Sequence, residues 1–169
     1  MSDRLTVRLA RTDELDQVGR LTLEAYVADG YANPAGSYAA ALADAPRRAR
    51  DAELLVAADP GGMVLGTITV CTPGSPLGEL SRSDELEFRM LAVAPEARRR
   101  GVGQALVVAV LQRATEVGAH RVVLCSAEKM CAAHRLYARL GFVRLPERDW
   151  QPVPEMTLLA FGKITRRPD

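Results

Sequence analysis

The sequence lacks the features that mark a membrane protein, a secreted protein or a metal site. Among its 169 residues no apolar run approaches the roughly 20 residues that span a bilayer, and the first residues lack the apolar stretch of a secretory signal. The three cysteines, Cys71, Cys125 and Cys131, are odd in number and have no metal-ligand spacing. The two histidines are not grouped with other metal-binding side chains. We therefore expect a cytoplasmic protein that holds no metal and enters no membrane.

The chain also lacks an excess of charge of either sign. Its 22 basic and 21 acidic residues give a formal net charge of +1, so nothing draws the whole protein to nucleic acid or to an anionic membrane. The length suits one domain with a real core, and no repeat or break in composition suggests a second one. We expect a single domain over residues 1–163 and a basic tail over 164–169, with a homodimer left open.

Apolar periodicity and turn residues predict an α/β protein. The expected architecture is a central mixed sheet of about six to seven strands flanked by about four helices. Strands are expected at residues 5–9, 53–58, 63–72, 85–93, 121–125, from 142 onward and at 156–161, and helices at 13–28, 38–49, 102–117 and 128–140. Thr12 or Asp13 is expected to cap the first helix, Ser37 the second, and Pro46 to kink or end that second helix. The loop over residues 73–83 is expected to be exposed and mobile.

A basic, glycine-containing segment between an expected strand and an expected helix is the most informative part of the chain. The first amides of a helix have no intrahelical partner, and the helix dipole adds positive charge there. Glycines allow a ligand to approach the backbone, and arginines suit phosphate oxygens. We therefore expect this segment to bind a pyrophosphate. Its residues are Arg98, Arg99, Arg100, Gly101, Val102, Gly103, Gln104 and Ala105.

The basic segment has three alternative interpretations. A dinucleotide-binding fingerprint needs a third glycine where Leu106 stands, and an acidic residue about 20 positions on, where the chain has His120-Arg121-Val122. A P-loop needs Gly-Lys-Ser/Thr, which is absent here. The remaining alternative is a run of solvated arginines at a helix start.

A fourth interpretation is carried by three motifs in register. Arg98-x-x-Gly101-x-Gly103 resembles the Arg/Gln-x-x-Gly-x-Gly/Ala motif of the GNAT superfamily of acyl-CoA-dependent N-acetyltransferases. The apolar run that ends at Pro95 resembles that family's central strand, and Ala133-x-x-x-Tyr137-x-x-x-Gly141-Phe142 resembles its later helix. The order of the expected elements is also that of the family fold. The resemblance implies an enzyme that transfers the acetyl group of acetyl-CoA to a primary amine through a ternary complex.

The resemblance assigns the coenzyme to the central strand and the basic segment. It implies that the strand residues Leu91, Ala92 and Val93 hold the pantetheine arm, mainly through the backbone of Leu91 and Val93. It also implies that amides between Arg99 and Gln104 bind the pyrophosphate, without a metal. Phosphate contacts from the side chains of Arg98 and Arg100 are expected as well.

Tyr137 and Glu87 are the expected catalytic pair. A phenol can protonate the departing thiolate, and a carboxylate can deprotonate an amine whose ordinary pKa is about 10.4. By strand alternation Glu87 shares a face with Leu91 and Val93, and Glu85 is the reserve base. The alternatives are a tyrosine packed on the sheet and an exposed carboxylate paired with Arg89.

One position departs from the family pattern. Many members have Asn three residues before the alanine that is Ala133 here, and this chain has Met130. The coenzyme contact of that Asn is then absent or supplied by another group such as Ser126, although Ser126 at a strand end is otherwise an ordinary turn residue. A cysteine nucleophile, Cys125 or Cys131, is the less favoured chemical route.

The acceptor site is expected, by resemblance, at the first two helices and the last loop. Aromatic and acidic residues there suit a cationic amine, and we expect a small amine or an amino-acid-like metabolite. The alternatives are a protein lysine or N-terminal acetyltransferase and a non-catalytic acyl-CoA sensor. The residues concerned are Tyr26, Asp29, Tyr31, Asp149 and Trp150.

Overall fold

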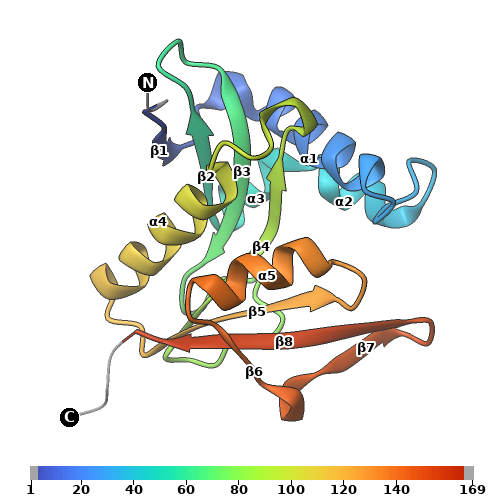
Figure 1. Ribbon diagram of the computed structural model, residues 1–169, viewed down its shortest axis with the longest axis vertical. Helices are drawn as coiled ribbons and strands as arrows, with labels where there is room; N and C mark the ends of the chain where they lie inside the picture. Colours follow the sequence, from blue (N-terminus) through green and yellow to red (C-terminus); the bar gives the residue numbers. More distant parts are fainter. Residues whose placement is uncertain (1–3, 166–169) are drawn as a thin grey trace. The chain divides into compact units, whose positions relative to one another are not determined.

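The computed structural model of the chain describes residues 4–165. Within them it confirms the mixed α/β class, with a mixed sheet of eight strands and five helices (Figure 1). The strands are β1 (Thr6–Leu9), β2 (Glu53–Ala58), β3 (Val64–Cys71), β4 (Glu85–Val93), β5 (Arg121–Ala127), β6 (Val143–Arg144), β7 (Trp150–Val153) and β8 (Met156–Ile164). The helices are α1 (Leu15–Ala28), α2 (Ser37–Ala43), α3 (Ala45–Asp51), α4 (Val102–Glu116) and α5 (Cys131–Arg139). None of the described helices is long and apolar enough to cross a membrane.

The chain forms two compact units, and β4 and α4 each contribute to both. The first unit contains the chain up to Val70 and Met90–Val110, and the second contains Cys71–Arg89 and the chain from Leu111 onward. In the first unit the strand order is β1-β2-β3-β4, with β1 and β3 antiparallel to β2. In the second the order is β4-β5-β8-β6, where β4 and β5 are parallel and β8 runs antiparallel to β5, β6 and β7.

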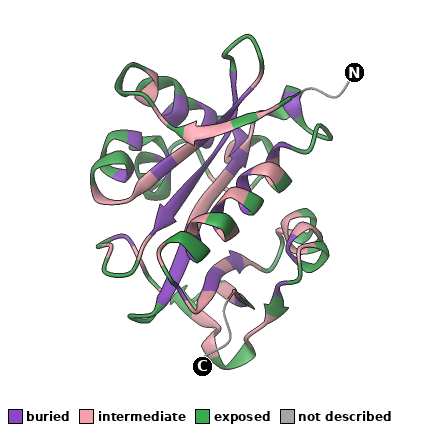
Figure 2. Cartoon of the chain, turned by 90° about the vertical axis from the view of Figure 1, so that its left-hand side faces the viewer, coloured by how far each residue is buried: buried purple, intermediate pink, exposed green. Residues whose placement is uncertain are grey.

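Strand β3 is the centre of the first unit. All eight of its residues are buried, as Figure 2 shows for the inner strands. The absence of a side chain at Gly66 lets α4 approach the sheet, because a Cβ there would lie 2.6 Å from Val102 Cγ1 and 3.0 Å from the Ala92 carbonyl oxygen. Figure 1 shows α4 on one side of β2 and β3 and helices α1 and α2 on the other. The backbone of the basic segment is therefore held to the sheet by close packing at this glycine.

The expected second helix is divided in two. Helix α2 ends at Ala43 and α3 begins at Ala45, with Pro46 in the first turn of α3 and the Asp44 side chain accepting from the Arg47 amide at 3.1 Å. Pro46 therefore begins a helix instead of kinking one. The expected caps are wrong, because neither Thr12 nor Asp13 nor Ser37 is an N-cap and a 3₁₀ turn, Thr12–Glu14, precedes α1.

The second unit buries an aromatic cluster under α5. The Tyr137 ring lies 5.7 Å from Phe88 on β4, 5.9 Å from Phe142 and 5.9 Å from Phe161 on β8, measured between centroids. Such pairs contribute about 0.5–1.5 kcal/mol each beyond the area they bury. Figure 1 shows α5 lying along β5 and β8. The cluster joins α5 to β4 and β8.

Two sequence expectations in the second unit are wrong. The expected loop over residues 145–154 contains a 3₁₀ turn, Pro146–Arg148, and strand β7, which pairs with β8 at Trp150 and Val153 with an irregularity between them. The two prolines in that segment favoured a loop in the sequence, but an edge strand such as β7 tolerates proline. The expected basic tail begins later than residue 164, because β8 includes Ile164 and Thr165 bonds the carbonyls of Ala119 and His120. Residues 166–169 lie outside the described part.

The close approach at Gly66 gives a stability prediction. Replacing Gly66 with Ala should lower the free energy of unfolding by about 1–3 kcal/mol, the usual cost of overpacking a core. Chemical denaturation measures the change. Gly61→Ala is the matched control, because its Cβ would meet nothing closer than Asp59 Oδ1 at 3.4 Å. Equal stability of the two variants would contradict the close packing of α4 on β3.

Candidate functional site

The backbone of the basic segment takes an unusual conformation before α4. Arg99 and Gly101 both have left-handed backbone angles, with φ of 64° and 76°. Nothing lies within 4 Å of a Cβ built on Gly101, so the conformation and not a lack of space favours glycine there. Alternation of left- and right-handed residues turns successive N–H groups toward one side, which makes a nest for an anion.

The first turn of α4 continues this set of donors. The helical hydrogen bond from the Ala105 amide to the Gly101 carbonyl is 3.0 Å long, so the amides of Val102, Gly103 and Gln104 precede the first intrahelical bond. With the helix dipole they offer partial positive charge along the same stretch. An arrangement of backbone amides like that over residues 99–104 is of the kind that suits a diphosphate.

The side chain of Arg98 is already paired. Its guanidinium donates two hydrogen bonds to the Asp29 carboxylate, of 2.6 and 2.8 Å, and this pairing raises the pKa of Arg98. The two side chains are 40% and 32% exposed, and such exposed pairs contribute about 0–1 kcal/mol. A phosphate contact by Arg98 or an amine contact by Asp29 would therefore have to replace or share this ion pair.

Strand β4 does not alternate regularly. Met90 has φ of 55°, which interrupts the extended backbone between Glu87 and Leu91. Strand alternation therefore no longer places Glu87 on the face of Leu91 and Val93. Ala92 is buried, and Leu91 and Val93 are half-buried.

Glu87 is fully buried and binds backbone. Its Oε1 accepts from the amides of Leu80 at 2.7 Å, Ser81 at 2.8 Å and Glu79 at 3.0 Å, and its Oε2 accepts from Glu79 at 3.2 Å. A carboxylate that accepts several backbone amides is strongly stabilised as the anion. The alternative of an exposed strand carboxylate is excluded, and this carboxylate holds the loop before β4.

Glu85, the reserve base, is also buried, and it is the centre of an ion-pair cluster. Arg148 donates to its two carboxylate oxygens at 2.8 and 3.0 Å, and the Arg82 amide donates at 2.9 Å. Burial raises the pKa of Glu85, but the hydrogen bonds from Arg148 and Arg82 outweigh that effect. The pKa of Glu85 therefore lies below its usual value.

The loop before β4 is tied down by several side chains. Besides its bonds to Glu85, Arg148 donates to the Leu80 carbonyl at 2.6 Å, and Arg89 donates to the Leu77 carbonyl at 3.1 Å. Arg89 also forms an ion pair with Glu79. The expected exposed, mobile loop is thus held against β4 over residues 77–82.

Tyr137 is buried under the loop that ends α5. Its side chain is 4% exposed, and burial raises the pKa of its phenol. Among the described residues, none forms a hydrogen bond with its hydroxyl. The phenol is therefore protonated over the physiological pH range, which is the state a general acid needs.

A histidine and a serine that sequence reasoning had set aside are in contact beside Tyr137. His134 Nε2 lies 3.1 Å from Ser126 Oγ, and Ser126 Oγ lies 3.5 Å from Met130 Sδ. Burial lowers the pKa of the His134 imidazole, although the nearby Ala127 backbone acts in the opposite direction. The sequence offered one signal, since His134 stands one residue after Ala133 in the motif on α5, but spacing alone does not show which face a helix presents.

The cysteines do not favour covalent catalysis. Burial raises the pKa of both Cys71 and Cys125 to about 11, so each is a thiol near neutral pH. The Trp150 indole N–H is buried and faces the Cys125 sulfur, and no described group accepts from it at hydrogen-bonding distance. The described residues contain no group of three or more acidic, histidine or cysteine side chains that could hold a metal ion.

Several of the expected acceptor residues already contact other residues of their own unit. In the first unit the Tyr26 ring lies edge-on to Tyr31 and Tyr38, at centroid distances of 6.4 and 6.5 Å. In the second unit the Asp149 carboxylate accepts from Arg144 at 2.5 Å and from the Ala160 amide at 2.7 Å. Tyr26 and Tyr31 therefore pack on one another, and Asp149 fixes β8 to the 3₁₀ turn before β7.

Comparison with known proteins gives a consistent result. The model of the acetyltransferase (GNAT) family matches residues 17–142. "N-acetyltransferase family 8 member 3" of Rattus norvegicus is 38% identical over 90 residues, which are 53% of this chain and 38% of that protein. "Mycothiol acetyltransferase" of Arthrobacter sp. (strain FB24) is 37% identical over 98 residues, 55% of this chain and 28% of that protein. The chain thus spans well under half the length of these two relatives.

A solved structure supports the same fold. The yncA protein of Salmonella typhimurium, described as an acetyltransferase and solved with its cofactor acetyl-CoA, superposes with a TM-score of 0.70. The match covers 98% of this chain and 96% of that one, at 19% identity. At this identity the likeness shows the fold alone.

The contacts of Glu87 predict how the loop before β4 responds to a mutation. Glu87→Gln replaces a carboxylate oxygen by an NH₂ group that faces amide donors, so amide hydrogen exchange over residues 79–81 should rise about tenfold or more, from the loss of about 1–3 kcal/mol. Glu79→Gln is the control, because it breaks the ion pair with Arg89 and leaves the Glu87 carboxylate intact. Equal exchange in both variants would contradict the loop-holding role.

Proposed function

Because this chain belongs to the acetyltransferase (GNAT) family, we propose that it transfers the acetyl group of acetyl-CoA to a primary amine by direct attack in a ternary complex. The observation that carries the proposal is the backbone conformation over residues 99–104. Left-handed angles at Arg99 and Gly101 lead into the first turn of α4, and such an arrangement of amides suits a diphosphate without a metal.

The coenzyme contacts follow from this arrangement. When bound, acetyl-CoA supplies the activated thioester. The amides over residues 99–104 hold its pyrophosphate, and the backbone of Leu91 and Val93 holds the pantetheine arm. Helix-end charge contributes about 0.3–1 kcal/mol per exposed anion and up to about 2 when partly buried, so several amides outweigh a single exposed arginine. Arg98 and Arg100 add long-range attraction, and Arg98 also ties the segment to Asp29.

Tyr137 is the proposed general acid. The departing thiolate has a conjugate acid with an ordinary pKa of about 8.5, below that of a phenol at about 10. Burial raises the pKa of Tyr137 further, so the phenol stays protonated until a stronger base forms beside it. Its packing against Phe88, Phe142 and Phe161 fixes the ring.

Glu87 is the base that the sequence predicts. Its carboxylate already accepts from three backbone amides, so its oxygens are occupied. For Glu87 to act as the base, a proton would have to arrive at an oxygen that is holding the loop.

The proposed acceptor is a small amine or an amino-acid-like metabolite. In the first unit Tyr26, Tyr31 and Asp29 combine aromatic surface with a charge that suits a cation, and in the second unit Trp150 and Asp149 do the same. Asp29 and Asp149 both have arginine partners, so an incoming ammonium group would replace a guanidinium. We also propose a single catalytic domain over residues 1–163 and a cytoplasmic location, which fits three cysteines of which none forms a disulfide.

A screen of amines tests the proposed function. Purified protein with acetyl-CoA should release thiol in the presence of at least one small amine from a library of polyamines, amino acids and aromatic amines. Tyr137→Phe should lower kcat by about 10²-fold or more with little change in coenzyme affinity, because it removes the acid and keeps the ring. Thiol release with peptides alone would favour the protein acetyltransferase, and coenzyme binding without turnover would favour the sensor.

The backbone cradle is tested separately by calorimetry. Gly101→Glu should weaken acetyl-CoA binding by roughly 100-fold or more, because it places a carboxylate among amides that bind a diphosphate. Gly62→Glu is a matched control, since Gly62 also has a left-handed backbone, φ 89°, and open space around its Cβ. Gly62→Glu should lose about as much stability as Gly101→Glu but should bind acetyl-CoA normally. Normal binding by Gly101→Glu would refute the cradle.

A further inference from the structure

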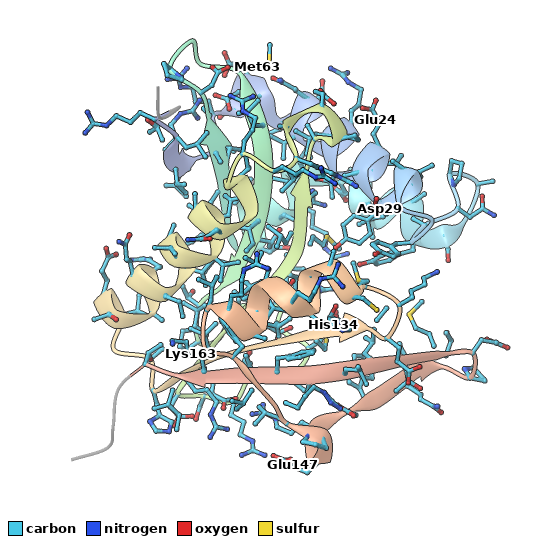
Figure 3. The ribbon with its side chains drawn as sticks, in the orientation of Figure 1. Glu24, Asp29, Met63, His134, Glu147 and Lys163 are labelled. Atoms are coloured by element: carbon cyan, nitrogen blue, oxygen red, sulfur yellow. The ribbon has the colours of Figure 1, made fainter. Side chains whose placement is uncertain are left out.

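The engaged state of Glu87 leaves open which group takes the proton of the amine. The described residues of the second unit contain a different arrangement that suits this task, built from the end of β5 and the first half of α5. Ser126 stands on β5 and is 5% exposed, and His134 faces it from α5 (Figure 3).

The contact between the imidazole and Ser126 suits a proton relay in one tautomer of the ring. His134 Nε2 lies 3.1 Å from Ser126 Oγ. In the neutral tautomer that carries its proton on Nδ1, Nε2 is an acceptor. The Ser126 hydroxyl then donates to Nε2 in place of Met130 Sδ, and its lone pairs stay available to accept a further hydrogen bond.

The surroundings favour the neutral ring. Burial lowers the pKa of His134, and the charge of Arg144 acts in the same direction. Arg144 on β6 lies over the Phe161 ring at 5.5 Å and is paired with Asp149. The His134 ring lies 5.0 Å from that same Phe161, and Tyr137, one turn further along α5, lies 5.9 Å from it. The titratable and charged groups around the imidazole are thus Tyr137, Arg144 and, through Arg144, Asp149.

We propose that His134, acting through the Ser126 hydroxyl, is the base that deprotonates the acceptor amine. This proposal rests on the proposed N-acetyltransferase function and names a residue pair for its proton transfer. The amine gives a proton to Ser126 Oγ as Ser126 gives its own to His134 Nε2. A serine hydroxyl passes a proton in this way without becoming charged.

The proton balance closes with Tyr137 as the acid. An amine that arrives as a cation loses one proton to His134 through Ser126, and His134 passes it to solvent. The nitrogen lone pair then forms the C–N bond to the acetyl carbon, and the C–S bond breaks as Tyr137 gives its phenolic proton to the thiolate sulfur. The second proton leaves the nitrogen and restores Tyr137 through solvent. One proton is released per acetylation, and no oxidant or metal takes part.

The pH dependence of kcat separates His134 from Glu87. With the amine found in the screen, wild-type kcat should rise with pH through an apparent pKa below the ordinary histidine value of about 6.5 and then level off. His134→Gln should lower kcat at neutral pH by about 10²-fold or more and abolish the rise of kcat with pH, with little change in KM for acetyl-CoA. Ser126→Ala should also lower kcat, since it breaks the relay. The proposal would be overturned if kcat still rose with pH in His134→Gln but no longer did so in Glu87→Gln.

A second measurement keeps this proposal distinct from the proposed function. The chain has two histidines, so His120→Gln assigns the imidazole signals in an NMR titration and serves as the activity control. His134 should be neutral at pH 7, with the proton on Nδ1, and Ser126→Ala should shift its Nε2 signal. A protonated ring at pH 7 would overturn the base assignment whether or not an amine is acetylated. Failure of every amine in the screen, with the neutral ring observed, would instead count against the function.

Discussion

Two buried carboxylates on β4 constrain the second unit more than any other feature. Glu85 and Glu87 are 2% and 0% exposed, and an unpaired carboxylate at that depth would cost several kcal/mol. The two carboxylates are stabilised in different ways. Glu85 is neutralised by Arg148 from the turn before β7 and by Arg121 on β5, and Glu87 accepts from backbone amides. The loop over residues 77–82 and the turn around Arg148 are therefore placed by the need to satisfy these charges.

This constraint changes how acidic residues on a central strand should be interpreted. A carboxylate predicted from sequence to be a base has to be available to a proton. Glu87 shows that burial beside a loop can instead make a carboxylate an anchor for that loop, through hydrogen bonds from the loop's backbone amides. The basic segment shows the opposite case, in which the backbone and not the charged side chains provides the expected binding geometry. Its arginines look decisive in the sequence, yet Arg98 is engaged with Asp29, and the backbone of Arg99 and Gly101 carries the anion-binding geometry.

Sequence patterns predicted most of the elements, and the physical reasons for the failures differ. Glycines at helix ends were informative, since Gly118 and Gly141 have left-handed φ of 72° and 91° and stand where α4 and α5 end. The left-handed angles at Met90 and Arg99 were not predictable, because non-glycine residues adopt them only under tertiary constraint. The contact of His134 with Ser126 depends on how α5 is rotated against β5, which the spacing of apolar residues in a nine-residue helix does not define.

A half-buried histidine is a more suitable base here than a buried carboxylate for a general electrostatic reason. Burial favours the neutral form of every ionisable group, and the neutral form is the active base of an imidazole but the inactive form of a carboxylate. Apolar surroundings such as Phe161 and Met130 therefore keep His134 ready to accept a proton. The same surroundings raise the pKa of Tyr137 and keep it ready to donate one. One aromatic environment can thus prepare an acid and a base together, whereas the oxygens of Glu87 are committed to the loop.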